Sequence, residues 1–118
     1  MTDSFRFADE LGPEKMVYIH RPAAGLRAVV AIDNLACGPA IGGVRWAPDA
    51  TPEEAFRLAR AMTLKNAAAG LAHGGGKAVI VGDPRQPQAA RERTVRAFAD
   101  AGCRYLQMDD TAWSMLCD

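Results

Sequence analysis

A continuous apolar run, KAVIVGD at residues 77–83, stands directly after three consecutive glycines. Glycine bounds this run on one side and a Gly-Asp-Pro turn signal follows it, a pattern typical of a strand that is buried on both faces. The preceding residues, 51–70, have the pattern of an amphipathic helix. A helix followed by a buried strand requires a fold in which helices pack onto a sheet.

The helix over residues 51–70 carries strong start and stop signals. Thr51 is the expected N-cap, Pro52 takes the first helical position, and Glu54 completes a capping box. Gly70 is the expected C-terminal stop. The residues that recur at helical spacing are Ala55, Leu58, Ala59, Met62 and Asn66.

Two further strands are expected near the N-terminus, at residues 16–21 and 26–33, because both segments are rich in β-branched or aromatic residues. The PAAG sequence between them has the length of a hairpin connection. Residues 37–50 contain several Gly and Pro and are predicted to form a loop with a short strand around Val44–Trp46.

A second helix is expected over residues 87–102, with Val95, Phe98 and Ala99 as its apolar stripe and Gly102 at its end. A short strand over residues 104–110 is expected to follow. The sequence therefore predicts an α/β fold, a three-layer α/β/α domain with a mixed, mostly parallel sheet.

Composition narrows the class of protein. The 118 residues suit one domain, and the formal net charge of zero gives no electrostatic reason to expect nucleic acid or an anionic membrane as partner. The longest apolar runs are too short to span a bilayer, and the acidic N-terminus lacks the apolar region of a signal peptide, so a cytoplasmic protein is expected. The three cysteines, Cys37, Cys103 and Cys117, show no CxxC spacing, which favours reduced thiols over a disulfide framework or a metal site.

The glycine run does not fit a phosphate-binding loop. A P-loop ending at Lys77 requires glycine at position 71 and Ser or Thr at position 78, where the chain has Leu71 and Ala78. It also requires a helix after the lysine, whereas a strand is expected here. The chain contains no G-x-G-x-x-G, so it shows no dinucleotide fingerprint of its own.

Two lysines and an acidic pair are the candidate chemical groups. Lys77 begins a buried strand, either as a functional cation or as an edge lysine whose ammonium group reaches solvent. Lys65 lies in the last two turns of the predicted helix, where it either joins Lys77 to bind a carboxylate or only complements the helix dipole. Asp109 and Asp110 end the expected last strand and are either a proton shuttle or ordinary turn acids.

The segments GPAIGGVRW and LARAMTLKNAAAGLAHGGGKAVIVGDPR closely resemble the N-terminal substrate-binding and dimerization domain of the glutamate/leucine/phenylalanine/valine dehydrogenases. The leucine and phenylalanine members are nearest, and the resemblance runs from about residue 14 to about residue 99. It implies that residues 1–118 form such a domain, with an atypical tail over 100–118 and without the family's C-terminal Rossmann domain.

The resemblance also implies roles for individual residues. Lys77 would polarise the substrate at its reacting carbon, and Lys65 would bind the substrate α-carboxylate. Met62, Gly42 and Gly43 would line the substrate pocket. In the tail, AGCRYLQMDDTAWSMLCD, Asp110 aligns with the family's catalytic Asp, although Thr-Ala-Trp replaces the residues expected after it. The tail also resembles a segment of the cobalamin-independent methionine synthase-like proteins.

The function that follows from the resemblance is the reversible oxidative deamination of an L-amino acid to a 2-oxo acid and ammonia. NAD(P) would be bound mainly by a separate Rossmann domain, so this chain alone is expected to be inactive. The expected partners are a small amino or oxo acid, a second copy of the chain and possibly a separate Rossmann subunit. The alternative is a non-catalytic module that binds amino or oxo acids or only self-associates.

Overall fold

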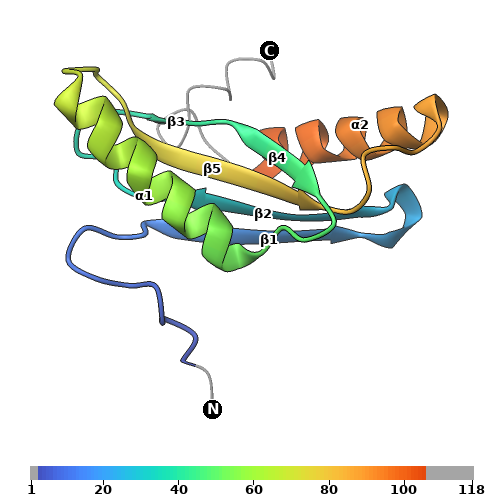
Figure 1. Ribbon diagram of the computed structural model, residues 1–118, viewed down its shortest axis with the longest axis horizontal. Helices are drawn as coiled ribbons and strands as arrows, with labels where there is room; N and C mark the ends of the chain where they lie inside the picture. Colours follow the sequence, from blue (N-terminus) through green and yellow to red (C-terminus); the bar gives the residue numbers. More distant parts are fainter. Residues whose placement is uncertain (1–2, 106–118) are drawn as a thin grey trace.

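The computed structural model describes residues 3–105 and places two helices against a five-stranded sheet (Figure 1). The elements in chain order are β1 (Lys15–Arg21), η1 (Pro22–Ala24), β2 (Leu26–Ile32), β3 (Ala40–Ile41), β4 (Val44–Ala47), α1 (Pro52–Ala68), β5 (Gly74–Val81) and α2 (Gln88–Tyr105).

The sheet has the order β1-β2-β5-β3, and β4 also pairs with β5. The predicted hairpin is confirmed, because β1 and β2 pair antiparallel from Lys15↔Ile32 to Arg21↔Leu26. The sheet is mixed as expected, but the prediction of a mostly parallel one is wrong. Buried β5 pairs antiparallel with β2, and only the short strands β3 and β4 run parallel to it. A continuous apolar run shows burial on both faces, and it carries no information on the direction of the neighbouring strand.

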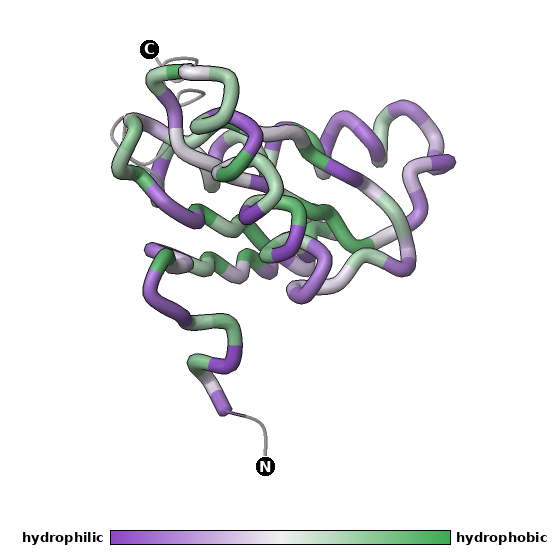
Figure 2. Tube along the Cα trace, turned by 60° about the vertical axis from the view of Figure 1, so that its left-hand side comes forward, coloured by the Kyte–Doolittle hydropathy of each residue, from purple (hydrophilic) through white to green (hydrophobic). Residues whose placement is uncertain are grey.

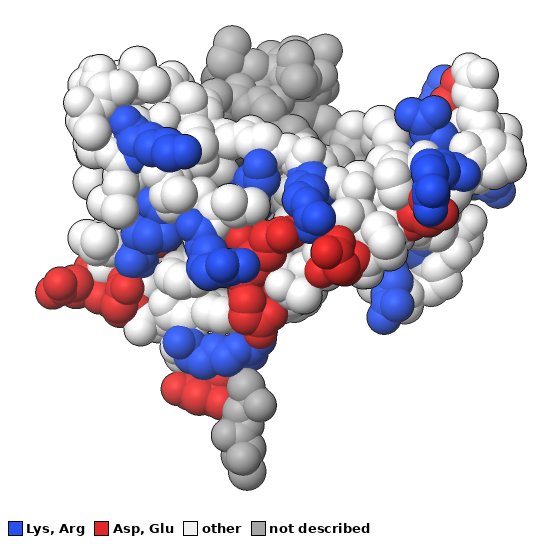
Figure 3. Space-filling model, in the orientation of Figure 1, with Lys and Arg blue, Asp and Glu red and all other residues white. Residues whose placement is uncertain are grey.

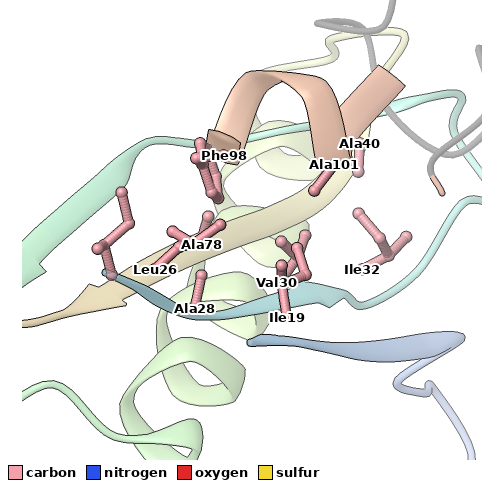
Figure 4. Packing of buried hydrophobic residues seen from close by; sticks show 10 residues of the cluster. Ile19, Leu26, Ala28, Val30, Ile32, Ala40, Ala78, Phe98 and Ala101 are labelled. Atoms are coloured by element: carbon pink, nitrogen blue, oxygen red, sulfur yellow. The ribbon is translucent and has the colours of Figure 1, made fainter. Parts of the chain in front are cut away.

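The two helices cover opposite faces of the sheet, which confirms the three-layer arrangement. Alternate residues of β2 and β5 point to opposite faces. Val29, Ala31 and Val79 pack with Ala55 and Ala59 of α1. The other face of the same strands packs against α2, as Figure 4 shows for Phe98 and Ala101. The buried residues of this second cluster are Ile19, Leu26, Ala28, Val30, Ile32, Ala40, Ala78, Ile80, Phe98 and Ala101.

Helix α1 begins and ends as its sequence predicts. The Thr51 side chain accepts a hydrogen bond of 3.1 Å from the Glu54 backbone N–H, and Pro52 is the first helical residue. At the other end Gly70 has a φ of 71°, in the left-handed region that favours glycine. Its N–H donates to the Ala67 carbonyl, and the N–H of Leu71 donates to that of Asn66, which is a Schellman cap.

Helix α2 differs from its prediction. Its buried residues are Thr94, Phe98 and Ala101, whereas Val95 is 48% exposed, so two of the three residues of the expected stripe face outward. Gly102 does not end the helix, which continues to Tyr105. Packing against the sheet outweighs the roughly 1 kcal/mol that glycine costs in a helix. Residues 104 and 105 are helical rather than the start of a strand, and the rest of the strand expected over 104–110 lies outside the described residues.

Strand β5 begins three residues earlier than its apolar run, because the three glycines belong to it. Gly75 shows what these glycines are needed for. A Cβ at this position would overlap the Thr63 nitrogen and the Ala59 carbonyl oxygen of α1. The helix backbone therefore lies directly on the strand backbone. The short strand β3, which the sequence analysis assigned to a loop, pairs with this same glycine segment.

The N-terminal segment packs along α1. The rings of Phe7 and Phe56 stack with centroids 5.1 Å apart, and Arg6 pairs with Glu53 at 2.6 Å. Figure 2 shows the hydrophobic residues concentrated in the central strands and hydrophilic ones along the outer turns. Within residues 3–105, neither helix has the length and apolar character needed to cross a membrane.

Two cysteines fall within the described residues. Cys37 is a free, exposed thiol, as expected. Cys103 is disulfide-bonded, so the expectation of reduced thiols is wrong for this residue. The absence of CxxC spacing excludes only close pairs in sequence, and it does not bear on a disulfide between cysteines at other separations.

The contact of β5 with α1 predicts unequal effects of two glycine substitutions in the same strand. Gly75→Ala should lower the free energy of unfolding by about 1–3 kcal/mol, because its Cβ meets rigid helix backbone. Gly76→Ala is the control, since its Cβ would lie 3.1 Å from the Ala40 Cβ and requires only a small shift. Urea denaturation of both variants measures the difference. Equal losses would contradict the proposed tight helix–strand contact.

Candidate functional site

The sheet edge formed by β3 and β4 is interrupted beside β5. Strand β3 pairs with Gly74 and Gly75, and β4 pairs with Ala78 to Val81. Between them the chain passes through Gly42 and Gly43, where the Gly43 carbonyl accepts a hydrogen bond of 3.1 Å from the Ala78 N–H. A Cβ at Gly42 would overlap the Gly76 carbonyl oxygen, so the backbones lie too close for any side chain.

Lys77 is the polar side chain of β5 at this interruption. It is half-buried, and strand alternation places it on the same face as Gly75 and Val79, which is the face that α1 covers. A Cβ at Gly43 would lie only 3.2 Å from the Lys77 Nζ. The ammonium group therefore lies over Gly43, and glycine at that position leaves the space for it.

A hollow of about 80 Å³ adjoins this point. Most of its apolar lining, including Val30, Ile32 and Ala78, belongs to the cluster under α2. Gly43 lines the hollow and also lies against the Lys77 Nζ, so the lysine stands at its rim. The residues that line it are Val30, Ile32, Ala40, Ile41, Gly42, Gly43, Val44, Gly76, Lys77 and Ala78.

The other predicted site residues lie on α1 or beyond the described part of the chain. Met62 is half-buried, one turn from the buried residues Ala59 and Asn66. Lys65 is exposed in the last turn, three residues after Met62, so the two side chains are neighbours on the helix surface. Lys65 and Lys77 thus lie on the same side of the sheet. Asp110 lies outside the described residues, and its catalytic role stays a prediction.

The sequence analysis missed a buried polar network beside these elements. Asp33, which directly follows β2, is fully buried and accepts hydrogen bonds from Arg60 at 2.7 Å and from the Thr63 hydroxyl at 2.7 Å. Arg60 also binds Asp9 through two hydrogen bonds of 2.8 Å. The available signal was an acid directly after the apolar run AVVAI, in a segment that was predicted only as a strand.

The Asp9–Arg60 pair perturbs both groups. Hydrogen bonds from Arg60 and from the Leu11 N–H lower the pKa of the Asp9 carboxyl well below its usual range. Hydrogen bonds to Asp9 and Asp33 raise the pKa of the Arg60 guanidinium further above its already high value. Arg60, like arginine in general, is therefore charged at neutral pH, and it is a structural cation rather than a proton carrier.

Charges of both signs are mixed on the face of the molecule that Figure 3 displays. Figure 3 shows Lys and Arg side chains interleaved with Asp and Glu on the face that it displays. Arg45, for example, binds both carboxylate oxygens of Glu54 and also contacts Asp49. Within residues 3–105 there is no group of three or more His, Cys, Asp or Glu side chains placed to hold a metal ion.

Comparison with known proteins identifies relatives for most of the chain. The model of the Glu/Leu/Phe/Val dehydrogenase dimerisation domain matches residues 13–115. Valine dehydrogenase of Streptomyces virginiae is 48% identical over 111 residues, which cover 87% of this chain and 30% of the relative. Leucine dehydrogenase of Bacillus subtilis is 45% identical over 107 residues, covering 87% of this chain and 28% of the relative. The chain thus spans less than a third of the length of these two relatives.

Solved structures agree with this result. A hetero-hexameric glutamate dehydrogenase of Thermus thermophilus, in a Leu-bound form, superimposes with a TM-score of 0.76 at 28% identity, covering 84% of this chain and 26% of that one. L-Tryptophan dehydrogenase of Nostoc punctiforme gives a TM-score of 0.67 at 34% identity, covering 81% and 28%. The resemblance of the tail to methionine synthase-like proteins gains no support, because the dehydrogenase match continues to residue 115.

The Asp9–Arg60 pair yields a prediction for pH dependence. Because the folded-state pKa of Asp9 is lowered, the pair stabilises the docked N-terminal segment fully above the ordinary Asp pKa and is lost as the pH falls through the lowered value. In Arg60→Gln the pKa of Asp9 should return toward its usual range, measured by NMR of the side-chain carboxyl carbons.

Asp83 is the matched control for this titration. Its pKa is lowered by the backbone N–H and then the side chain of Arg85, so Arg60→Gln should leave it unchanged. If Asp9 titrates at the same pH in both proteins, Arg60 is not the cause of its shift.

Proposed function

The chain belongs to the Glu/Leu/Phe/Val dehydrogenase family, and from this membership we propose that it is the substrate-binding part of an amino acid dehydrogenase. The reaction is the reversible oxidative deamination of an L-amino acid to a 2-oxo acid and ammonia. The observation that best supports this proposal is the Lys77 ammonium group over Gly43, on the sheet face that also carries Lys65.

In the proposed site each residue acts through simple chemistry. The exposed Lys65 ammonium group binds the substrate α-carboxylate by a charge-assisted hydrogen bond. Lys77 donates a hydrogen bond to the oxygen, water or nitrogen at the reacting carbon and so stabilises charge that develops there. Met62, Gly42 and Gly43 form the wall on which the substrate lies. Asp110 is proposed as the group that carries the proton.

The residues of this chain do not fit the dinucleotide cofactor. A pyrophosphate requires a glycine-rich loop that opens a helix, whereas the three glycines lie inside β5 and pack on protein backbone. We therefore assign NAD(P) to a Rossmann domain in the part of the longer relatives that this chain does not span, and we expect the chain alone to be inactive. Residues 1–118 as one substrate-binding domain, and a cytoplasmic location, belong to the same proposal.

The two lysines should separate binding from turnover. In the isolated chain, Lys65→Gln should weaken binding of 2-oxoisovalerate by about 10- to 100-fold, the effect expected for the loss of one hydrogen bond between charged groups. Lys77→Gln should leave that affinity within about threefold, since Lys77 acts at the reacting carbon. Chemical-shift titration by NMR measures both. Lys15→Gln, which removes the same charge from β1, is the control and should bind like the wild type.

Turnover is tested in a longer protein. With the chain joined to the C-terminal portion of Streptomyces virginiae valine dehydrogenase, Lys77→Gln should reduce the rate of valine oxidation by more than about 100-fold. Binding without turnover in the joined wild-type protein would favour the non-catalytic module. If neither lysine affects binding or turnover, the proposed site is wrong.

We further propose that β1 mediates self-association, as a dimerisation-domain family suggests. Among the described strands β1 pairs only with β2, so its other edge faces no described strand. Tyr18 on this strand is 61% exposed. A second copy that pairs along the same edge would continue the sheet across a two-fold axis.

A charge on β1 tests this association. Tyr18→Lys should shift the chain toward the monomer in light scattering coupled to size-exclusion chromatography, because lysine on an edge strand opposes strand pairing. Leu64→Lys is the control: Leu64 is also exposed, at 56%, but lies on α1. If only the Leu64 variant dissociates, the interface lies on α1 and not along β1.

A further inference from the structure

We infer that Asp33, acting through Thr63 and Arg60, is the positioning residue that sets Lys65 and Lys77 in their relative places. This inference rests on the proposed function, since it concerns the same two lysines. Asp33 lies at the end of β2 and touches neither of them in the contacts described above. Asp33 is important because it is hydrogen-bonded both to α1, which carries Lys65, and to β5, which carries Lys77.

The first set of contacts joins Asp33 to α1. Arg60 donates from Nε to Asp33 Oδ2 at 2.7 Å and from Nη2 to Oδ1 at 3.1 Å. The Thr63 hydroxyl donates to Oδ2 at 2.7 Å. Arg60 and Thr63 are three residues apart and so lie on one flank of the helix. Two contacts on this flank fix both the rotation of α1 and its position along the sheet.

The second set joins the same region to β5. The Asp33 backbone N–H donates to the Gly75 carbonyl at 2.9 Å. Gly75 in turn lies against the backbone of α1 at Thr63, and the buried Asn66 side chain donates to the Gly74 carbonyl at 2.9 Å. Helix, strand and carboxylate therefore form a closed set of contacts within about two turns of α1.

Burial makes this set of contacts specific. The Asp33 side chain is 0% exposed and that of Arg60 only 18%, so water has little access to the hydrogen bonds that join them. Burial of a carboxyl group is costly unless hydrogen-bond donors surround it. Any shift of α1 along the sheet would break these hydrogen bonds together, which gives the helix one preferred position.

The lysines lie close in sequence to these contacts. Lys65 is two residues after Thr63, and Lys77 is two residues after Gly75 on the same face of β5. A displacement of α1 relative to β5 therefore moves the Lys65 ammonium group relative to Lys77 and to the wall at Gly42 and Gly43, so the carboxylate of a bound substrate loses its partner. Displacements of about 1 Å between binding groups can reduce activity by about 100-fold.

Thr63→Val tests the inference with little risk to the fold, because valine keeps the β-branched shape and removes only the hydroxyl. We expect binding of 2-oxoisovalerate to this chain to weaken by about tenfold or more, and amide hydrogen exchange at residues 63–65 and 74–77 to accelerate. Thr63→Ser, which keeps the hydroxyl, should restore both. NMR provides both measurements on one sample.

Thr94→Val is the matched control. Thr94 is a buried threonine of α2 whose hydroxyl donates to the Ala24 and Ala90 carbonyls, and it lies on the opposite face of the sheet. Thr94→Val should lower the melting temperature, as Thr63→Val does. It should leave 2-oxoisovalerate binding within about twofold and amide hydrogen exchange at residues 63–65 and 74–77 unchanged.

The possible results separate the inference from the proposed function. If the wild type binds 2-oxoisovalerate and Thr63→Val binds it equally well with unchanged exchange, the positioning role is wrong and the proposed function stands. If Thr63→Val and Thr94→Val weaken 2-oxoisovalerate binding equally, the cause is lower overall stability, and the positioning role of Asp33 is again wrong. If the wild type does not bind, the proposed function fails, while the exchange comparison still decides whether Asp33 couples α1 to β5.

Discussion

The close approach of α1 to β5 is the constraint on which the rest of the structure depends. At Gly75 no side chain fits between the two backbones, so the helix lies directly on the strand. Short separation leaves little room for sliding, and the buried hydrogen bonds of Asp33 and Asn66 then select one position. The glycines before Lys77 are therefore needed first for packing within the protein. Delivery of the lysine to the interruption between β3 and β4 is a consequence of that packing.

Local sequence signals were sufficient to predict the features that depend on neighbouring residues in the chain. The Thr51 cap, the Gly70 stop and the PAAG connection each depend on residues adjacent in the chain, and the structure confirms all three. Strand direction depends on partners distant in sequence, which explains why the sheet contains more antiparallel pairing than predicted. In α2 the sequence pattern pointed to Val95, but contact with the sheet buries Thr94 instead. Propensity yields to tertiary packing at such positions.

The candidate site was predictable to the extent that its residues resemble a family motif. Lys65, Lys77 and Gly43 follow from the resemblance, and the structure adds that Gly43 leaves room for the Lys77 ammonium group. Asp33, Arg60 and Thr63 were not predicted. Their hydrogen bonds join residues 27 and 30 positions apart in the sequence. Taken alone, each residue could equally be an ordinary polar residue on the surface or at the end of a strand. Such a network becomes visible only when the helix is placed on the sheet.

The two sides of the sheet near Gly43 differ in chemical character. On the α1 side stand the two cations, which in the proposed function would recognise groups common to all amino acids and 2-oxo acids. On the α2 side the hollow is lined mainly by aliphatic residues such as Val30 and Ile32. Cations fixed by a rigid helix–strand contact can serve any substrate of this class, because the carboxylate and the reacting carbon do not change from one substrate to the next. Selection among side chains must then come from apolar walls, and a hollow of about 80 Å³ supplies only part of such a wall. In the proposed function the remaining wall would come from the portion of the longer relatives that this chain does not span, so the two lysines would fix the chemistry common to the substrates more firmly than the choice among them.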